Sequence, residues 1–319
     1  MEIKMKNKIK GSLYEINKKH ILTVFFSSLA VCLILRFYQA AKLIDHTTGF
    51  YIKNSFITVL FYLILFASSL AILLMSFISS NVKELKNKYI KKNKALGTIS
   101  ILSAISFLID FFDQLAVSLG GSQKAATDNG FPFTMSSGVI PARIQIFFAL
   151  LSVLYFIIIA IRIFTGKEIL RKYKILCTAP IGWATIKLVS LFATQISFIR
   201  VSDLFLEIVT NSFAAIFFLS YAQSISGVYE KEARWRMTGA GLVFSLVALI
   251  TQIPRFIFTI SGKTDLVNNN YIVNYAVLML ALFSIVLIFT VFKNQESLHK
   301  ETEIKIPEED DSSEETDNK

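Results

Sequence analysis

Eight long apolar runs divide the 319-residue chain and constrain its fold more than any other feature. A transmembrane helix needs about 20 mostly apolar residues, because it crosses about 30 Å of hydrocarbon at about 1.5 Å per residue. The runs lack the strict alternation of strands, and only helices or closed barrels satisfy the backbone in lipid. We therefore predict an all-α bundle of eight transmembrane helices, at about residues 20–41, 54–79, 96–119, 141–164, 174–195, 202–224, 237–260 and 271–293.

The composition supports this interpretation. Hydrophobic residues make up 54% of the chain and charged residues 18%, whereas soluble domains average about 45–50% apolar and about 25% charged residues. The numbers therefore argue against a soluble globule and against a disordered chain. We predict three segments: a basic cytoplasmic tail over residues 1–19, a transmembrane domain over residues 20–294, and an acidic, disordered cytoplasmic tail over residues 295–319.

Basic residues gather at one side of the predicted bundle. Most of the 33 Lys and Arg residues lie in the two tails and in the connections after the second, fourth and sixth runs. Because Lys and Arg accumulate on cytoplasmic loops, we expect a multi-pass protein of the cell membrane with both termini in the cytoplasm. The same rule accounts for the net charge of +10, so binding to nucleic acid is not needed to explain it. The lipid bilayer is the expected partner, and the sequence names no protein partner.

Charged residues inside the apolar runs, with a few polar neighbours, give the only strong signal for a functional site. A charge near the centre of a bilayer costs about 3 kcal/mol on insertion scales, and such residues usually face a bundle interior or a wet cavity. In the predicted topology they all fall in the outer halves of the runs. We predict a ligand-binding or intramembrane charge site that consists of Arg36, Asp110, Asp113, Trp183, Lys187, Asp203, Glu207, Gln252 and Arg255.

Helical spacing places these residues on shared faces and leaves two interpretations open. At about 100° per residue, Asp203 shares a face with Glu207, and Trp183 shares one with Lys187. In one interpretation the faces line a polar cavity that opens to the outside, as in a transporter or a protein that binds a small polar ligand or ion. In the other, they form buried ion pairs that only fix helix packing, as in a non-catalytic membrane scaffold that binds partners.

The sequence favours no enzyme class. The D-x-x-D pattern from Asp110 to Asp113 and the D-x-x-x-E pattern from Asp203 to Glu207 could hold Mg²⁺ against a diphosphate, as in membrane prenyltransferases. However, the flanking Asn, Arg and Lys residues of those motifs are absent, and the predicted topology places both patterns outside. The sequence has no P-loop and no zinc-like spacing of His or Cys. We therefore predict no catalytic residue, no cofactor and no metal.

Two stretches resemble a group of uncharacterised multi-pass membrane proteins of Gram-positive bacteria. The stretches are LILRFYQAAKLIDHTTGFY (residues 33–51) and APIGWATIKLVSLFATQISFIRVSDLFLEI (residues 179–208), followed by QIPR at 252–255. The R-x-x-Q, D-x-x-T-G-F and P-x-x-W patterns of that group are matched here by Arg36, Gln39, Asp45, Thr48, Gly49, Phe50, Pro180 and Trp183. The group has no assigned activity, so the resemblance implies a multi-pass architecture in a bacterial plasma membrane and no function.

Overall fold

Eight long α-helices form the fold in the computed structural model, which describes residues 2–44, 51–52, 55–79, 93–127, 139–166, 174–193, 201–262 and 273–304. They are α1 (Glu2–Lys42), α2 (Phe56–Ser79), α3 (Lys94–Thr127), α4 (Val139–Thr165), α5 (Ala179–Ala193), α6 (Val201–Ser226), α7 (Glu230–Ile260) and α8 (Tyr275–Ile304), with a 3₁₀ helix, η1 (Lys174–Thr178), before α5. No strand occurs within these ranges, and eight helical segments are long and apolar enough to cross a membrane. The prediction of an all-α bundle with eight spans is confirmed.

The helices extend beyond the apolar runs at several ends. α1 already begins at Glu2, α3 continues to Thr127, and α8 continues to Ile304. The apolar run therefore marks where a helix crosses lipid and not where it begins or ends, because polar residues can prolong a helix into water. Residues 305–319 of the predicted acidic tail lie outside the described residues.

α7 lies at the centre of the bundle. It contacts α1, α2, α6 and α8, and it has the largest buried share of the eight candidate spans. A Cβ atom added at Gly241 would lie 2.7 Å from the ring of Phe217 and 2.9 Å from Ile288, so glycine permits the close approach of α6 and α8. The hydroxyl of Ser245 donates a hydrogen bond to the carbonyl of Ala281 on α8, at 3.1 Å. Small residues and hydroxyl bonds of this kind stabilise helix contacts in membranes.

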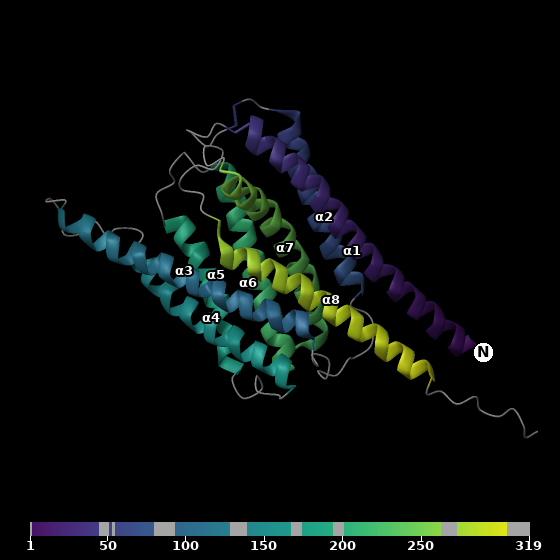
Figure 1. The fold of residues 1–319 in the computed structure, drawn as a ribbon. Coiled ribbons are helices and arrows are strands. Elements are labelled where there is room, and N and C mark those ends of the chain that lie inside the picture. The colour runs from purple at the N-terminus through teal and green to yellow at the C-terminus, as the bar shows by residue number, and fades with distance from the viewer. Residues whose placement is uncertain are drawn as a thin grey trace, which may run out of the picture.

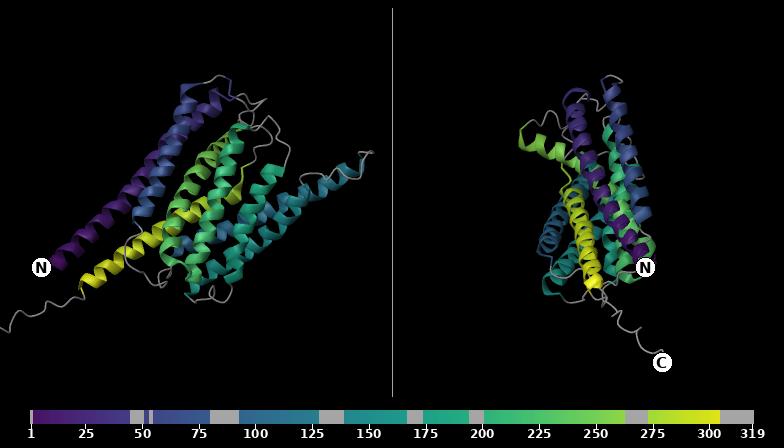
Figure 2. Two further views of the ribbon diagram at one scale, coloured as in Figure 1. Left: turned by 180° about the vertical axis from the view of Figure 1, so that it is seen from behind. Right: turned by 90° about the vertical axis from the view of Figure 1, so that its right-hand side faces the viewer.

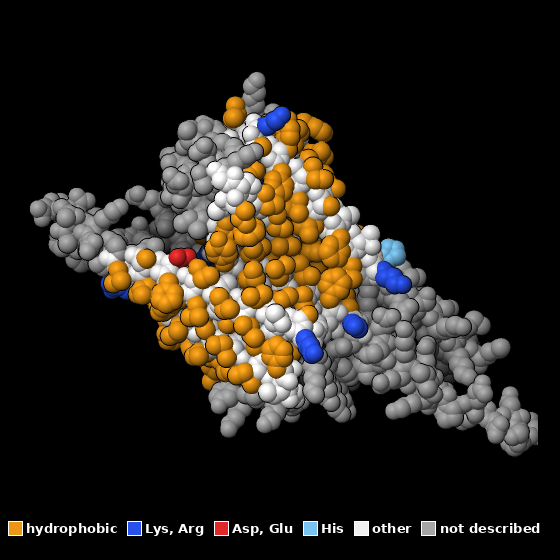
Figure 3. Space-filling view, in the orientation of Figure 1, with side chains coloured by type: hydrophobic (Ala, Val, Ile, Leu, Met, Phe, Trp, Pro, Cys, Tyr) orange, Lys and Arg blue, Asp and Glu red, His pale blue; other side chains and the backbone are white. Residues whose placement is uncertain are grey.

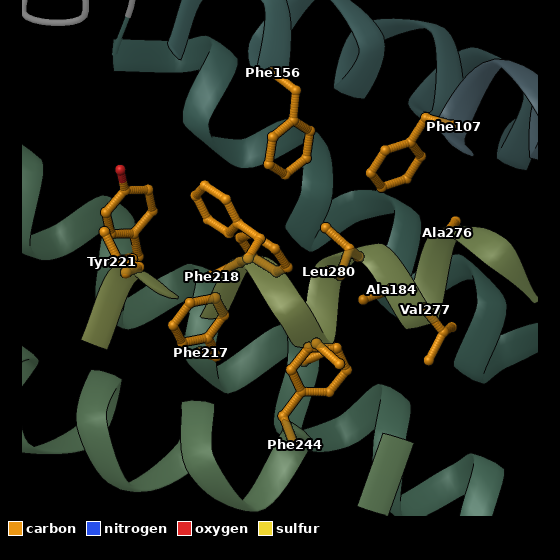
Figure 4. Close-up of a cluster of buried hydrophobic side chains, with 14 of the residues drawn as sticks. Phe107, Phe156, Ala184, Phe217, Phe218, Tyr221, Phe244, Ala276, Val277 and Leu280 are labelled. Carbon is orange, nitrogen blue, oxygen red and sulfur yellow. The ribbon is translucent and has the colours of Figure 1, made fainter. Parts of the chain in front are cut away.

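Two clusters of buried hydrophobic side chains fill the bundle. The larger cluster joins α3, α4, α5, α6, α7 and α8 and is rich in aromatic rings (Figure 4). In it the rings of Phe107 and Phe156 stack with their centroids 5.5 Å apart, and Phe217 packs near Phe244. The smaller cluster joins α1 and α2 to α6, α7 and α8. These contacts hold the helices in a fixed order around α7, because dispersion between packed side chains is a main attraction between helices in lipid.

The surface and the chain ends agree with a membrane-spanning bundle. Hydrophobic side chains cover most of the described face in Figure 3, and Lys and Arg side chains lie near its edges. The start of α1 and the end of α8 point to the same end of the bundle (Figures 1 and 2). We call the opposite end the far end: α1, α3, α5 and α7 finish there, and α2, α4, α6 and α8 begin there.

Candidate functional site

Four charged side chains from three helices meet at the far end. Asp203 of α6 accepts hydrogen bonds from Arg36 of α1 through Oδ1 and from Arg255 of α7 through Oδ2, the latter at 3.1 Å. Arg255 also donates to Oε1 of Glu207, at 2.9 Å. Arg36, Asp203 and Arg255 are buried, and the side chain of Glu207 is 29% exposed. We call these four residues the arginine–carboxylate network; its two positive and two negative charges balance.

The directions of the helices explain why these charges meet. Asp203 lies in the first turn of α6, and Glu207 follows four residues later on the same face. Arg36 and Arg255 lie near the ends of α1 and α7 that finish at the far end. The helix dipole favours the carboxylate of Asp203 in the first turn of α6, whereas the two arginines lie more than one turn before their helix ends and are held by the pairing itself. Antiparallel packing of α6 against α1 and α7 thus brings both signs of charge to one place.

Polar side chains of α1, of α2 and of the segment between them lie near Arg36. Oε1 of Gln39 accepts a hydrogen bond from Arg36, at 3.2 Å, and Gln39 is fully buried. The hydroxyls of Tyr51 and Tyr62 lie 3.2 Å apart, close enough to Arg36 to interact with it. Gln39 is the glutamine of the R-x-x-Q pattern, but the sequence prediction did not include it in the site. Its spacing of three residues from an intramembrane arginine was the signal that could have identified it.

A second polar cluster joins α3, α4 and α5. Oδ2 of Asp110 accepts hydrogen bonds from the indole Nε1 of Trp183, at 2.8 Å, and from Nε2 of Gln145, at 3.3 Å. All three side chains are buried, and the indole ring packs edge-on against Phe107. We call Asp110, Trp183 and Gln145 the aspartate–indole cluster. The sequence prediction missed Gln145, although a lone amide in an apolar run was a usable signal.

Lys187 lies between the two groups of residues. Its Nζ is 4.9 Å from the centroid of the Trp183 ring, one helical turn earlier on α5. It is also close enough to interact electrostatically with Asp110 and Asp113 of α3 and with Glu207 of α6, and the like-charged Arg255 of α7 is near enough to repel it. Within the described ranges, however, Nζ forms no ion pair and no hydrogen bond. Its positive charge is therefore placed near three carboxylates without pairing directly with any of them.

The remaining two predicted site residues, Asp113 and Gln252, form no ion pair or hydrogen bond with either group among the described residues. Asp113 is exposed and has no ion pair with any residue that the structure describes. Oε1 of Gln252 accepts a hydrogen bond from the backbone N–H of Asn274, at 2.9 Å, and Asn274 in turn accepts one from the N–H of Val277 in the first turn of α8. Gln252 therefore stabilises the start of α8, and no hydrogen bond joins it to the arginine–carboxylate network.

Comparison with known proteins identifies no relative of this chain. No protein-family model, no curated protein and no solved structure matches the chain. The resemblance to a Gram-positive family therefore stays a prediction, and Asp45, Thr48, Gly49 and Phe50 of its D-x-x-T-G-F pattern lie outside the described residues. In the ranges given above, no group of three His, Cys, Asp or Glu side chains could hold a metal ion.

Proposed function

We propose that this protein is a transporter-like or ligand-binding protein of the cell membrane that binds a small polar ligand or ion at the far end. In this proposal both termini lie in the cytoplasm, and the far end opens to the outside through a water-filled cavity. The observation that carries the proposal is the position of Lys187, which lies between the arginine–carboxylate network and the aspartate–indole cluster but forms no ion pair or hydrogen bond with either.

The energetic reason is the cost of an ammonium inside a membrane. Such a group costs several kcal/mol in hydrocarbon, and that cost falls only if water, a counter-charge or a ligand solvates it. Its stacking on Trp183 provides about 0.5–2 kcal/mol, which does not replace three hydrogen bonds. The nearby carboxylates lower this cost by attraction at a distance, but no described residue accepts a hydrogen bond from Nζ, so solvent and a bound polar solute are the candidates for its acceptors.

A second candidate function, that of a membrane scaffold, is favoured by the pairing within the arginine–carboxylate network. Each of its four charged side chains has a partner of opposite charge in the network, and the network is neutral. Buried pairs of this kind can specify which helices pack together without binding a ligand. The scaffold interpretation accounts for Arg36, Asp203 and Arg255, but it gives no role to Lys187.

Ligand-induced stabilisation separates the two functions. The protein is reconstituted in lipid nanodiscs and its thermal unfolding is followed with a panel of small polar solutes and ions. A ligand that binds the folded state well above its Kd should raise the Tm by about 2 °C or more. The shift should vanish in Lys187→Met and persist in Lys293→Met, a lysine exposed at the other end of the bundle. A panel in which no solute raises the Tm, or equal shifts in both variants, would favour the scaffold.

A further inference from the structure

The charged groups at the far end divide into a paired set and an open set. The paired set is Arg36, Asp203 and Arg255, which satisfy one another. The open set is the ammonium of Lys187, the carboxylate of Asp113 and Oε2 of Glu207, none of which has a hydrogen-bond or ion-pair partner among the described residues. The open set is also the more accessible one, because Asp113 is exposed and Lys187 and Glu207 are only partly buried.

A buried amide adds a further open acceptor beside Glu207. Asn211 lies one turn further along α6, is 2% exposed, and donates from Nδ2 to the backbone carbonyl of Glu207 at 2.8 Å. Its Oδ1 has no hydrogen-bond partner. An unsatisfied buried acceptor is rare and needs an explanation such as water or a bound donor. The side of the site along α6 therefore holds acceptors without a partner, Oδ1 of Asn211 and Oε2 of Glu207, whereas the side along α5 offers hydrogen-bond donors from Lys187.

The aspartate–indole cluster holds the ring over which the lysine lies. Gln145 and the indole N–H both bond Asp110, so the ring of Trp183 is held by a hydrogen bond at one edge and by Phe107 packing. Lys187 lies over that ring. A ligand that binds the ammonium would therefore find it at a defined position above the ring. The side chain of Lys187 would then lose little conformational entropy when the ligand binds.

We propose that the ligand of this site is a small zwitterion, whose carboxylate binds Lys187 and whose ammonium binds the carboxylates of Glu207 and Asp113. This inference rests on the proposed function and specifies its ligand class. A simple anion could accept hydrogen bonds from the lysine but would leave the open carboxylate oxygens of Asp113 and Glu207 without a donor, and a simple cation could bind those carboxylates but would leave the ammonium without an acceptor. A molecule that carries both charges satisfies the lysine donors and the acceptors on α3 and α6 together.

The test uses probes that differ by one charged group. The Tm of the reconstituted protein is measured with alanine or γ-aminobutyrate as zwitterions, with propionate or butyrate as carboxylates, and with ethylamine or propylamine as amines, all at equal concentration. We expect only zwitterions to raise the Tm. Loss of a hydrogen bond to a charged group should weaken their binding about tenfold or more in Lys187→Met. Glu207→Gln should weaken it as well, whereas Lys187→Arg should retain binding.

The possible failures of the two proposals differ. If a carboxylate or an amine alone raises the Tm as much as the matched zwitterion does, the ligand class is wrong but the proposed function stands. The same conclusion follows if the wider solute panel yields a Lys187-dependent ligand and no zwitterion shifts the Tm. If no solute of either panel raises the Tm of the wild-type protein, both proposals are wrong. Lys293→Met serves as the control in every series.

Discussion

Neutralising Asp203 should destabilise the bundle more than any change to a surface charge. This carboxylate is the only member of the network that bonds both arginines. The isosteric variant Asp203→Asn leaves Arg36 and Arg255 close together with a net charge of about +1 in a buried site. Removing one partner of a buried pair costs about 3–5 kcal/mol. Because Arg255 keeps its bond to Glu207, we expect a value near the lower limit, about 3 kcal/mol.

A matched control and a double variant make this prediction specific. Glu232→Gln removes an exposed pair with Arg236, within one helix, and should cost about 0.3–0.5 kcal/mol. Combining Asp203→Asn with Arg36→Met restores neutrality, so the double variant should recover about 1 kcal/mol or more relative to the sum of the single effects. The free energy of unfolding is measured by SDS titration in mixed micelles. An Asp203→Asn effect as small as that of Glu232→Gln, or strict additivity in the double variant, would refute the buried network.

Three further predictions follow from the packing. Gly241→Ala should cost about 1–3 kcal/mol by pressing a Cβ into Phe217, and a thermal unfolding curve that matches the wild type would contradict the close contact between α6 and α7. Trp183→Phe keeps a ring but removes a donor from buried Asp110, and should lower the unfolding free energy by about 1–3 kcal/mol. Cys32 and the second cysteine are buried, so a water-soluble thiol reagent should modify neither until the protein is unfolded in SDS; rapid labelling of the native protein would count against the packing.

The spans were predictable because their signal is local. A run of about 20 apolar residues predicts a transmembrane helix by itself, independently of the helices that pack around it. The ends of the helices were less predictable, since Gly120 and Gly121 lie inside α3 and not in a loop. A glycine weakens a helix by about 1 kcal/mol, and the other residues of a long helix can offset that amount.

The sequence identified the charged residues of the candidate site but not which of them pair. The sequence placed Arg36, Asp203 and Arg255 in the outer part of the predicted bundle, but their pairing depends on α1 and α6 lying beside α7, which no local pattern encodes. The same limit explains Gln252, whose place in an apolar run resembled that of a site residue. Its partner, the backbone of Asn274, lies directly before α8 and is far from Gln252 in the sequence.

Water access to Lys187 tests the central proposal most directly. Lys187→Cys and Val189→Cys are each introduced after Cys32→Ala and Cys177→Ala, and intact cells are treated with a membrane-impermeant thiol reagent. Val189 lies two residues away on α5 and is 49% exposed on the outer surface of the bundle, so it should face lipid. Thiols react as thiolates, which need water. We predict that Lys187→Cys reacts from outside the cell and Val189→Cys does not; a Lys187→Cys variant that stays unmodified, or reacts only in opened cells, would contradict an outward polar cavity.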